Sequence, residues 1–194
     1  MMETPPHLEA ATRQQQAAAR DCGLGFTKTT LPSTIHARLL EHLRTSAHRF
    51  RAEPKIDYID NLAPGTIPAL YFEDKAFNEG LLRELQPLHE AWCKMPLIES
   101  ACYGIRAYQR GTFLYNHVDH TDTHVISSTI CVDHRLSGKW PLYVEDAAGN
   151  GHQLDLDPGD MVFYEGARLR HGRAYPLPGD YYAAIFVHYR PEGS

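Results

Sequence analysis

The chain has 194 residues, enough for one domain with a well-buried core. With 43% hydrophobic and 22% charged residues, its composition is typical of a soluble globular protein and excludes a disordered one. The formal net charge of −5, without a run of basic residues, argues against a nucleic-acid-binding protein. The sequence has no apolar stretch of membrane-spanning length and no signal-peptide pattern, so we expect a cytoplasmic protein without a membrane partner.

The N-terminal residues differ in composition from the rest of the chain. Residues 1–25 contain few large apolar side chains, and we expect them to form a flexible N-terminal tail. The remaining residues, 26–194, are expected to form a single domain. Within that domain, we expect helices over residues 30–100 that support a β core over residues 101–191.

Two amphipathic helices are predicted in the supporting part. The first begins at Ser33 or Thr34, and its apolar residues recur with helical periodicity. The second runs over about residues 75–94, with Pro87 as a candidate kink. Several prolines and aromatic residues between the helices, over residues 51–73, predict irregular structure.

From residue 101 onward, short runs rich in Val, Ile, Tyr and Phe alternate with turn residues. The predicted strands cover residues 102–108, 124–132, 140–145, 152–156, 161–165, 169–174 and 181–189. Gly149-Asn150-Gly151 and Pro158-Gly159-Asp160 are strong turn signals between them. Strands at this spacing are typical of a sandwich or barrel, so the expected fold class is mainly β with N-terminal helices (α+β).

The four cysteines, Cys22, Cys93, Cys102 and Cys131, are scattered and include no C-x-x-C pair. This spacing argues against a structural zinc site and against a disulfide framework. We therefore expect free thiols.

Candidate metal ligands occur in His117-Val118-Asp119, where alternate residues of a strand point to the same face. A second H-x-D pattern, His120-Thr121-Asp122, follows at once, and either pattern alone is also compatible with a polar turn. A distant histidine, His171, would complete a set of two imidazoles and one carboxylate. Such a facial triad holds Fe(II) on one side and leaves the opposite positions open for a co-substrate and dioxygen.

Four motifs carry a family resemblance: Tyr108-x-x-Gly111-x-x-Leu114-x-x-His117-x-Asp119, Pro158-Gly159-Asp160-Met161, His171-Gly172-Arg173 and Gly179-Asp180-Tyr181-Tyr182. With them, residues 101–191, about half of the chain, resemble the prolyl 4-hydroxylase-like branch of the Fe(II)- and 2-oxoglutarate-dependent oxygenases. The resemblance implies a double-stranded β-helix of the jelly-roll or cupin type. Its register implies His117, Asp119 and His171 as metal ligands and catalytic residues, in preference to His120 and Asp122.

The activity implied by the resemblance is that of an oxidoreductase, a dioxygenase that releases succinate and CO2. It would hydroxylate an unactivated C–H bond of a peptidyl residue, an amino acid or a small metabolite. The implied cofactors are Fe(II), 2-oxoglutarate and O2, with ascorbate as a further candidate. Related halogenases have a small residue in place of the carboxylate ligand, so Asp119 favours hydroxylation. The partner would be a small-molecule or peptide substrate, and a monomer and a homodimer are both open.

For 2-oxoglutarate, the resemblance implies a tyrosine nine positions before the first ligand, which Tyr108 matches. It also implies a basic residue about ten positions after the distal histidine, but this position is Tyr181 here, so Tyr181 is itself a candidate for binding 2-oxoglutarate. A dicarboxylate in a dry pocket needs a cationic or strongly hydrogen-bonding partner. Arg173, two residues after His171, is the leading substitute and Arg106 the second, although either arginine could instead form a surface ion pair.

Two other functions stay open on the sequence alone. One is a cupin-type module that binds or isomerises a sugar or holds a non-redox metal. The other is a pseudo-enzyme or interaction domain, for which Tyr181 is the best argument. Several further residues are candidates for the pocket or, equally, for the core or the surface: His124, Trp140, Tyr115 and Tyr164. We expect His188 not to be a ligand, because it lies on the strand face opposite Tyr181.

Overall fold

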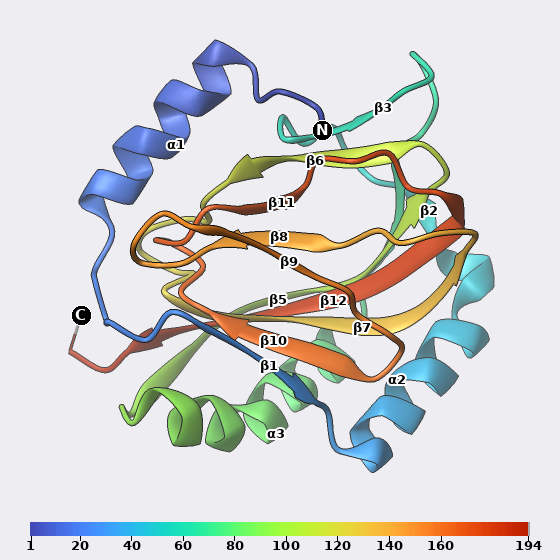
Figure 1. Ribbon diagram of the computed structural model, residues 1–194. Coiled ribbons are helices and arrows are strands. Elements are labelled where there is room, and N and C mark those ends of the chain that lie inside the picture. Colours follow the sequence, from blue (N-terminus) through green and yellow to red (C-terminus); the bar gives the residue numbers. More distant parts are fainter. Residues whose placement is uncertain (194) are drawn as a thin grey trace.

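The computed structural model describes residues 1–193, which form two antiparallel sheets with helices around them (Figure 1). The larger sheet has the strand order β1-β10-β7-β12-β5-β4-β2, and the smaller sheet has the order β3-β6-β11-β8-β9. A mainly β architecture of two sheets with helices outside them confirms the expected fold class.

The strand bounds show how far the β core extends along the chain. The larger sheet contains β1 (Phe26–Thr30), β10 (Asp160–Tyr164), β7 (Ile126–Leu136), β12 (Gly179–Pro191), β5 (Leu97–Gln109), β4 (Ala69–Phe72) and β2 (Arg51–Ala52). The smaller sheet contains β3 (Ile59–Asn61), β6 (Thr112–His117), β11 (His171–Arg173), β8 (Leu142–Glu145) and β9 (Gly151–Leu154). Each predicted strand after residue 101 overlaps an observed one, and β6 is an additional strand.

The central strand β12 separates two hydrophobic cores because its alternate residues face opposite sides of the larger sheet. Ile185 and Val187 pack in the core that the helices cover. Tyr182 and Ala184 belong to the core that contains residues of both sheets. Side chains on this second face therefore point into the space between the sheets, where a cavity is also found.

The helices are α1 (Pro6–Ala18), α2 (Ser33–Thr45), α3 (Lys75–Cys93) and the short 3-10 helix η1 (Ala47–Arg49). Helices α2 and α3 lie on the outer face of the larger sheet (Figure 1). Asp74 caps α3, since its side chain accepts a hydrogen bond from the Phe77 amide (3.1 Å). Helix α2 begins at Ser33 as expected, but Pro32 occupies the cap position, so Ser33 is the first helical residue.

The segment expected to be irregular, residues 51–73, contains the short strands β2, β3 and β4. β4 pairs with β5 over four residues, from Ala69 opposite Tyr108 to Phe72 opposite Ile105. Strands this short carry little periodicity, and their pairing depends on strands that come much later in the sequence.

The segment expected to be a flexible tail contains helix α1, although its composition gave no reason to expect an ordered helix. Pro6 stands at the first helical position, where a missing N–H costs little. The helix has few large apolar residues, and contacts with distant residues hold it in place. Glu9 accepts hydrogen bonds from Arg170, and the Gln16 side chain donates to the Arg168 carbonyl oxygen. The domain boundary at residue 26 stays a prediction.

The cysteines are free thiols, as the sequence predicts. Cys93 and Cys131 are buried, and Cys22 and Cys102 are half-buried. Among residues 1–193, none of the helices is both long and apolar enough to cross a membrane.

Candidate metal centre

Two paired strands bring the candidate histidines together. His117 is the last residue of β6 and His171 the first residue of β11, and the two stand directly opposite each other in the sheet register. Asp119 lies just beyond the end of β6, where its amide donates a hydrogen bond to the Gly166 carbonyl oxygen (2.9 Å). The carboxylate thus reaches the histidines from the loop after β6 rather than from the same strand.

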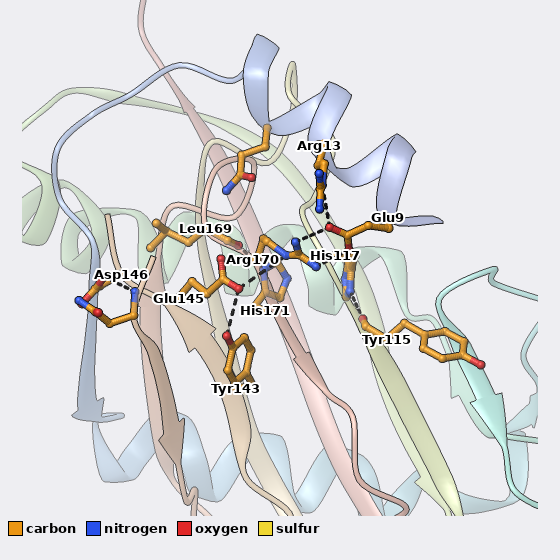
Figure 2. A network of polar contacts seen from close by, with 12 residues as sticks. Glu9, Arg13, Tyr115, His117, Tyr143, Glu145, Asp146, Leu169, Arg170 and His171 are labelled. Atoms are coloured by element: carbon orange, nitrogen blue, oxygen red, sulfur yellow. Dashed lines mark hydrogen bonds and ion pairs between the residues drawn. The ribbon is translucent and has the colours of Figure 1, made fainter. Parts of the chain in front are cut away.

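The three side chains converge on one point. Asp119 Oδ1 lies 3.9 Å from His117 Nε2 and 3.6 Å from His171 Nε2, and the candidate ligand atoms all lie within 4.8 Å of one another. The Nδ1 atom of each histidine is 2.8 Å from a backbone carbonyl oxygen, that of Tyr115 or of Leu169 (Figure 2). In the neutral form of each imidazole, Nδ1 therefore carries the proton, which leaves the Nε2 lone pair for a metal ion.

The surroundings of Asp119 fit a bound cation. Its second oxygen, Oδ2, is buried and has no hydrogen-bond partner among residues 1–193. A buried anionic oxygen without a partner is costly, unless an ion occupies the site. Gly166 leaves room for it, because a Cβ atom there would lie 2.5 Å from Oδ2. Two imidazole nitrogens and one carboxylate oxygen are the donor set of a non-haem Fe(II) centre.

The protonation states of His117 and Asp119 also fit metal binding. Burial, together with the neighbouring His171, lowers the pKa of His117 to about 3. Burial alone would raise the pKa of Asp119, but the charge and the hydrogen bond of His171 outweigh it and hold that pKa below its usual range. Burial opposes the charged form of His171, yet Asp119 raises the pKa of this histidine. A neutral His117 and an ionised Asp119 are the forms that bind metals.

The competing H-x-D pattern is not part of this cluster. His120 and Asp122 are exposed, and neither belongs to the cluster formed by the other three residues. The structure brings together His117, Asp119 and His171, the set that the family register implies.

A cavity of about 710 Å³ opens on this cluster, and Arg173 lines it. The guanidinium is buried, and its planar face lies over the rings of Trp140 and Tyr182, with centroids 4.7 and 4.3 Å away. One Nη atom donates to the Trp140 carbonyl oxygen and the other to the Tyr182 hydroxyl (2.8 Å). Within the described chain, no carboxylate forms an ion pair with Arg173, so this buried charge lacks a counterion.

Arg106, the second candidate, also lines the cavity but has a counterion. Its Nε and Nη2 atoms donate to the Glu53 carboxylate over 2.7–2.9 Å, and its Nη1 atom donates to the Tyr108 hydroxyl (3.3 Å). Burial raises the pKa of Tyr108, so the hydroxyl keeps its proton and can donate it to a ligand. Of the two arginines, Arg173 is the one without a carboxylate partner among the described residues.

Tyr181 does not line the cavity, contrary to the sequence expectation. Its hydroxyl donates to Asp133 Oδ2 (2.7 Å), and its ring packs against the helix-covered core. The register between β12 and β7 shifts between Gly179 and Tyr181, so counting positions from His171 gives the wrong face. Tyr182 is the residue that faces inward, and its hydroxyl accepts a hydrogen bond from Arg173.

Glu53, Tyr58 and His188 are among the cavity residues that sequence analysis missed. Glu53 and Tyr58 lie in the segment expected to be irregular, and the Tyr58 ring stacks on His117 with centroids 3.8 Å apart. His188 lies on the face opposite Tyr181, as expected, but that face is the cavity side. The alternation of β12 could have identified His188 once Tyr181 was placed on the outer face.

The remaining candidates are divided between cavity and core. His124, Tyr115 and Tyr164 line the cavity, and the Tyr164 ring meets His171 edge-on with centroids 4.7 Å apart. Trp140 is buried in the core between the sheets, where it contacts the rings of Tyr108 and Tyr182.

Comparison with known proteins gives structural but no sequence-level matches: no family model and no curated protein matches this sequence. A prolyl-4-hydroxylase from Pseudomonas putida has a similar structure, with a TM-score of 0.62 and 17% identity over 95% of this chain and 99% of that one. A prolyl hydroxylase from Trichoplax adhaerens was solved with a hypoxia inducible factor peptide fragment. Its TM-score is 0.63, at 12% identity over 98% of this chain and 94% of that one.

A third similar structure is HygX from Streptomyces hygroscopicus, with nickel, 2-oxoglutarate and hygromycin B bound. Its TM-score is 0.59, at 13% identity over 98% of this chain and 88% of that one. At these identities the likeness establishes the fold, and the expected double-stranded β-helix is confirmed.

Proposed function

We propose that this protein is an Fe(II)- and 2-oxoglutarate-dependent dioxygenase that hydroxylates an unactivated C–H bond. The balanced reaction converts the substrate C–H, 2-oxoglutarate and O2 into the alcohol, succinate and CO2. The observation that carries the proposal is that a buried cluster of two histidines and one aspartate shares its cavity with Arg173, a buried cation without a counterion.

His117, Asp119 and His171 would hold the iron. When bound, Fe(II) supplies the activation of O2 and the oxidative decarboxylation of 2-oxoglutarate at its open positions. The protein's part is to fix the ligands, and the backbone bonds to both Nδ1 atoms do so before any metal arrives. The Tyr58 and Tyr164 rings beside the histidines limit the access of water to them.

Arg173 would bind the distal carboxylate of 2-oxoglutarate. Its guanidinium is held in one plane between two aromatic rings and two acceptors, so little side-chain entropy is lost when an anion binds. An N–H fork matches a carboxylate, and the buried position makes the resulting pair strong. The Tyr108 hydroxyl, which accepts from Arg106, can donate to the same ligand.

An anaerobic titration with Fe(II) and 2-oxoglutarate tests the proposal through the metal-to-ligand charge-transfer band. We expect the band in the wild type and its loss in His117→Ala and in His171→Ala. His120→Ala is the matched control, since this exposed histidine is also next to the site, and it should keep the band. On admission of O2, succinate should form. A cupin-type module without redox chemistry would show neither the band nor succinate.

We also propose a cytoplasmic location. The four cysteines are free thiols, which suits a reducing compartment. Fractionation of cells that produce the tagged protein would test this location, and recovery outside the cytoplasm would contradict it.

A further inference from the structure

Helix α1 limits the space available to a substrate. Leu8, Thr12 and Gln15 of this helix line the cavity, and Thr12 is only 3% exposed. Figure 2 shows the helix beside the two ligand histidines, with Glu9 bonded to Arg170. The cavity of about 710 Å³ has to hold the metal, 2-oxoglutarate and the substrate. This space suits a small molecule better than a polypeptide segment.

Two opposite charges lie next to each other in the cavity wall. Glu53 and Arg106 both line the cavity, and their side chains are 8% and 13% exposed. A buried ion pair is weak evidence for stability, because an apolar pair of similar volume often stabilises a fold as well or better. Stabilisation of the fold therefore does not explain the pair, and its position in the cavity wall indicates a role in ligand binding.

The pair keeps unused hydrogen-bonding groups. A guanidinium has five N–H donors, and the bonds to Glu53 and to Tyr108 use one each on Nε, Nη2 and Nη1. Arg106 thus has further N–H groups for a carboxylate, and Glu53 has further lone pairs for an ammonium group.

The charges select among substrates. An anion would be attracted by Arg106 and repelled by Glu53, and a cation would meet the reverse. A ligand with both charges satisfies both residues and adds no net charge to the buried site. Since Glu53 and Arg106 are in direct contact (2.7 Å), the matching ligand has its two charges close together, as in an α-amino acid.

We propose that the substrate is a free amino acid, whose carboxylate binds Arg106 and whose ammonium group binds Glu53. This rests on the proposed function, because it assigns a substrate class to the same cavity. An amino acid within a peptide chain lacks both charges and would leave both residues without a ligand.

The first test uses the wild-type enzyme with Fe(II), 2-oxoglutarate and O2. The probes are the proteinogenic L-amino acids, each as the free amino acid, the N-acetyl derivative, the methyl ester and the central residue of a tripeptide with blocked ends. We expect at least one free amino acid to raise succinate formation above the substrate-free rate. Its N-acetyl and ester forms should have a kcat/KM roughly 10- to 100-fold lower, since each loses one charged hydrogen bond.

Variants then separate binding from a merely structural ion pair. Glu53→Gln should reduce the preference for the free amino acid over its N-acetyl form, and Arg106→Gln should reduce its preference over the ester. If the ion pair only connects two segments of the chain, each of the two variants should change both preferences together. Arg110→Gln is the matched control, because it removes an exposed ion pair with Asp180 and should leave both ratios unchanged.

Three results would overturn the inference: stimulation by the blocked tripeptide alone, equal use of the free and blocked forms, or no stimulation by any free amino acid while the charge-transfer band is present. If the band itself is missing from the wild type, the proposed function fails. Amino-acid recognition is then decided by thermal shift with nickel and 2-oxoglutarate, which needs no turnover. Stabilisation by a free amino acid but not by its blocked forms supports the inference, and its absence rejects it.

Discussion

Arg170, which immediately precedes His171, donates two hydrogen bonds to Glu9 of helix α1, at 2.7 and 2.6 Å. The Glu9 and Arg170 side chains are 24% and 18% exposed, so solvent screens this ion pair only in part. One contact thus couples the N-terminal helix to a strand of the candidate metal centre, although the two residues are 161 positions apart.

We expect Glu9→Gln to loosen helix α1 without unfolding the domain. A partly buried, charge-assisted pair contributes roughly 1.5–3 kcal/mol, so cleavage by trypsin at Arg13 should become about tenfold faster or more. Arg38→Gln is the matched control, because it removes the more exposed ion pair with Glu84. Unchanged cleavage at Arg13 in Glu9→Gln would show that other contacts hold the helix.

The same ion pair predicts a pH dependence for helix α1. The hydrogen bonds from Arg170 lower the pKa of Glu9 from 4.5 to about 2. A carboxyl group whose pKa is lower in the folded state stabilises that state above its unfolded pKa, and loses the effect as the pH falls through its folded pKa. Amide hydrogen exchange in α1, relative to α3 in the same sample, should therefore accelerate between about pH 4.5 and pH 2. Glu9→Gln should lack this relative change.

Arg173→Gln should weaken 2-oxoglutarate binding far more than metal binding. Loss of one partner of a buried, hydrogen-bonded charge pair costs roughly 2–5 kcal/mol, which corresponds to a rise in Kd of about 30-fold or more. A titration of the charge-transfer band measures 2-oxoglutarate affinity, and calorimetry with Ni(II) measures metal affinity. Arg173→Lys keeps the charge but lacks the fork, so its affinity should be intermediate. An unchanged 2-oxoglutarate affinity in Arg173→Gln would reject this role.

The parts of the site that follow from local sequence were predictable. The strand that carries His171 comes from a β-rich run bounded by turns, whereas β6, which carries His117, was not among the predicted strands. The choice of His117 and Asp119 as ligands rested on the family resemblance. Arg173 was predictable from local sequence, since alternation along β11 puts it on the metal side of the sheet. For His171 and Arg173, neighbouring residues determine which way the side chain points.

The parts that depend on distant pairing were not predictable. The irregularity between Gly179 and Tyr181 decides whether Tyr181 or Tyr182 faces the core between the sheets, and it is visible only in the pairing of β12 with β7. Glu53 joins Arg106 across 53 positions, and no local pattern marks either residue as a partner of the other. Helix α1 also could not be predicted from local sequence, because contacts with residues near the other end of the chain hold it in place.

Gly166 should be required for metal binding, because its missing side chain makes room for Asp119. A Cβ atom at residue 166 would lie 2.5 Å from both Asp119 Oδ2 and Ser127 Oγ, so Gly166→Ala must displace the carboxylate. Loss of ligand orientation typically lowers metal affinity roughly 10- to 100-fold, and calorimetry with Ni(II) would measure this loss. Gly80→Ala in α3 is the matched control, since a Cβ there meets nothing within 4 Å and alanine favours a helix. Equal metal affinities in the two variants would mean that Asp119 is not a ligand.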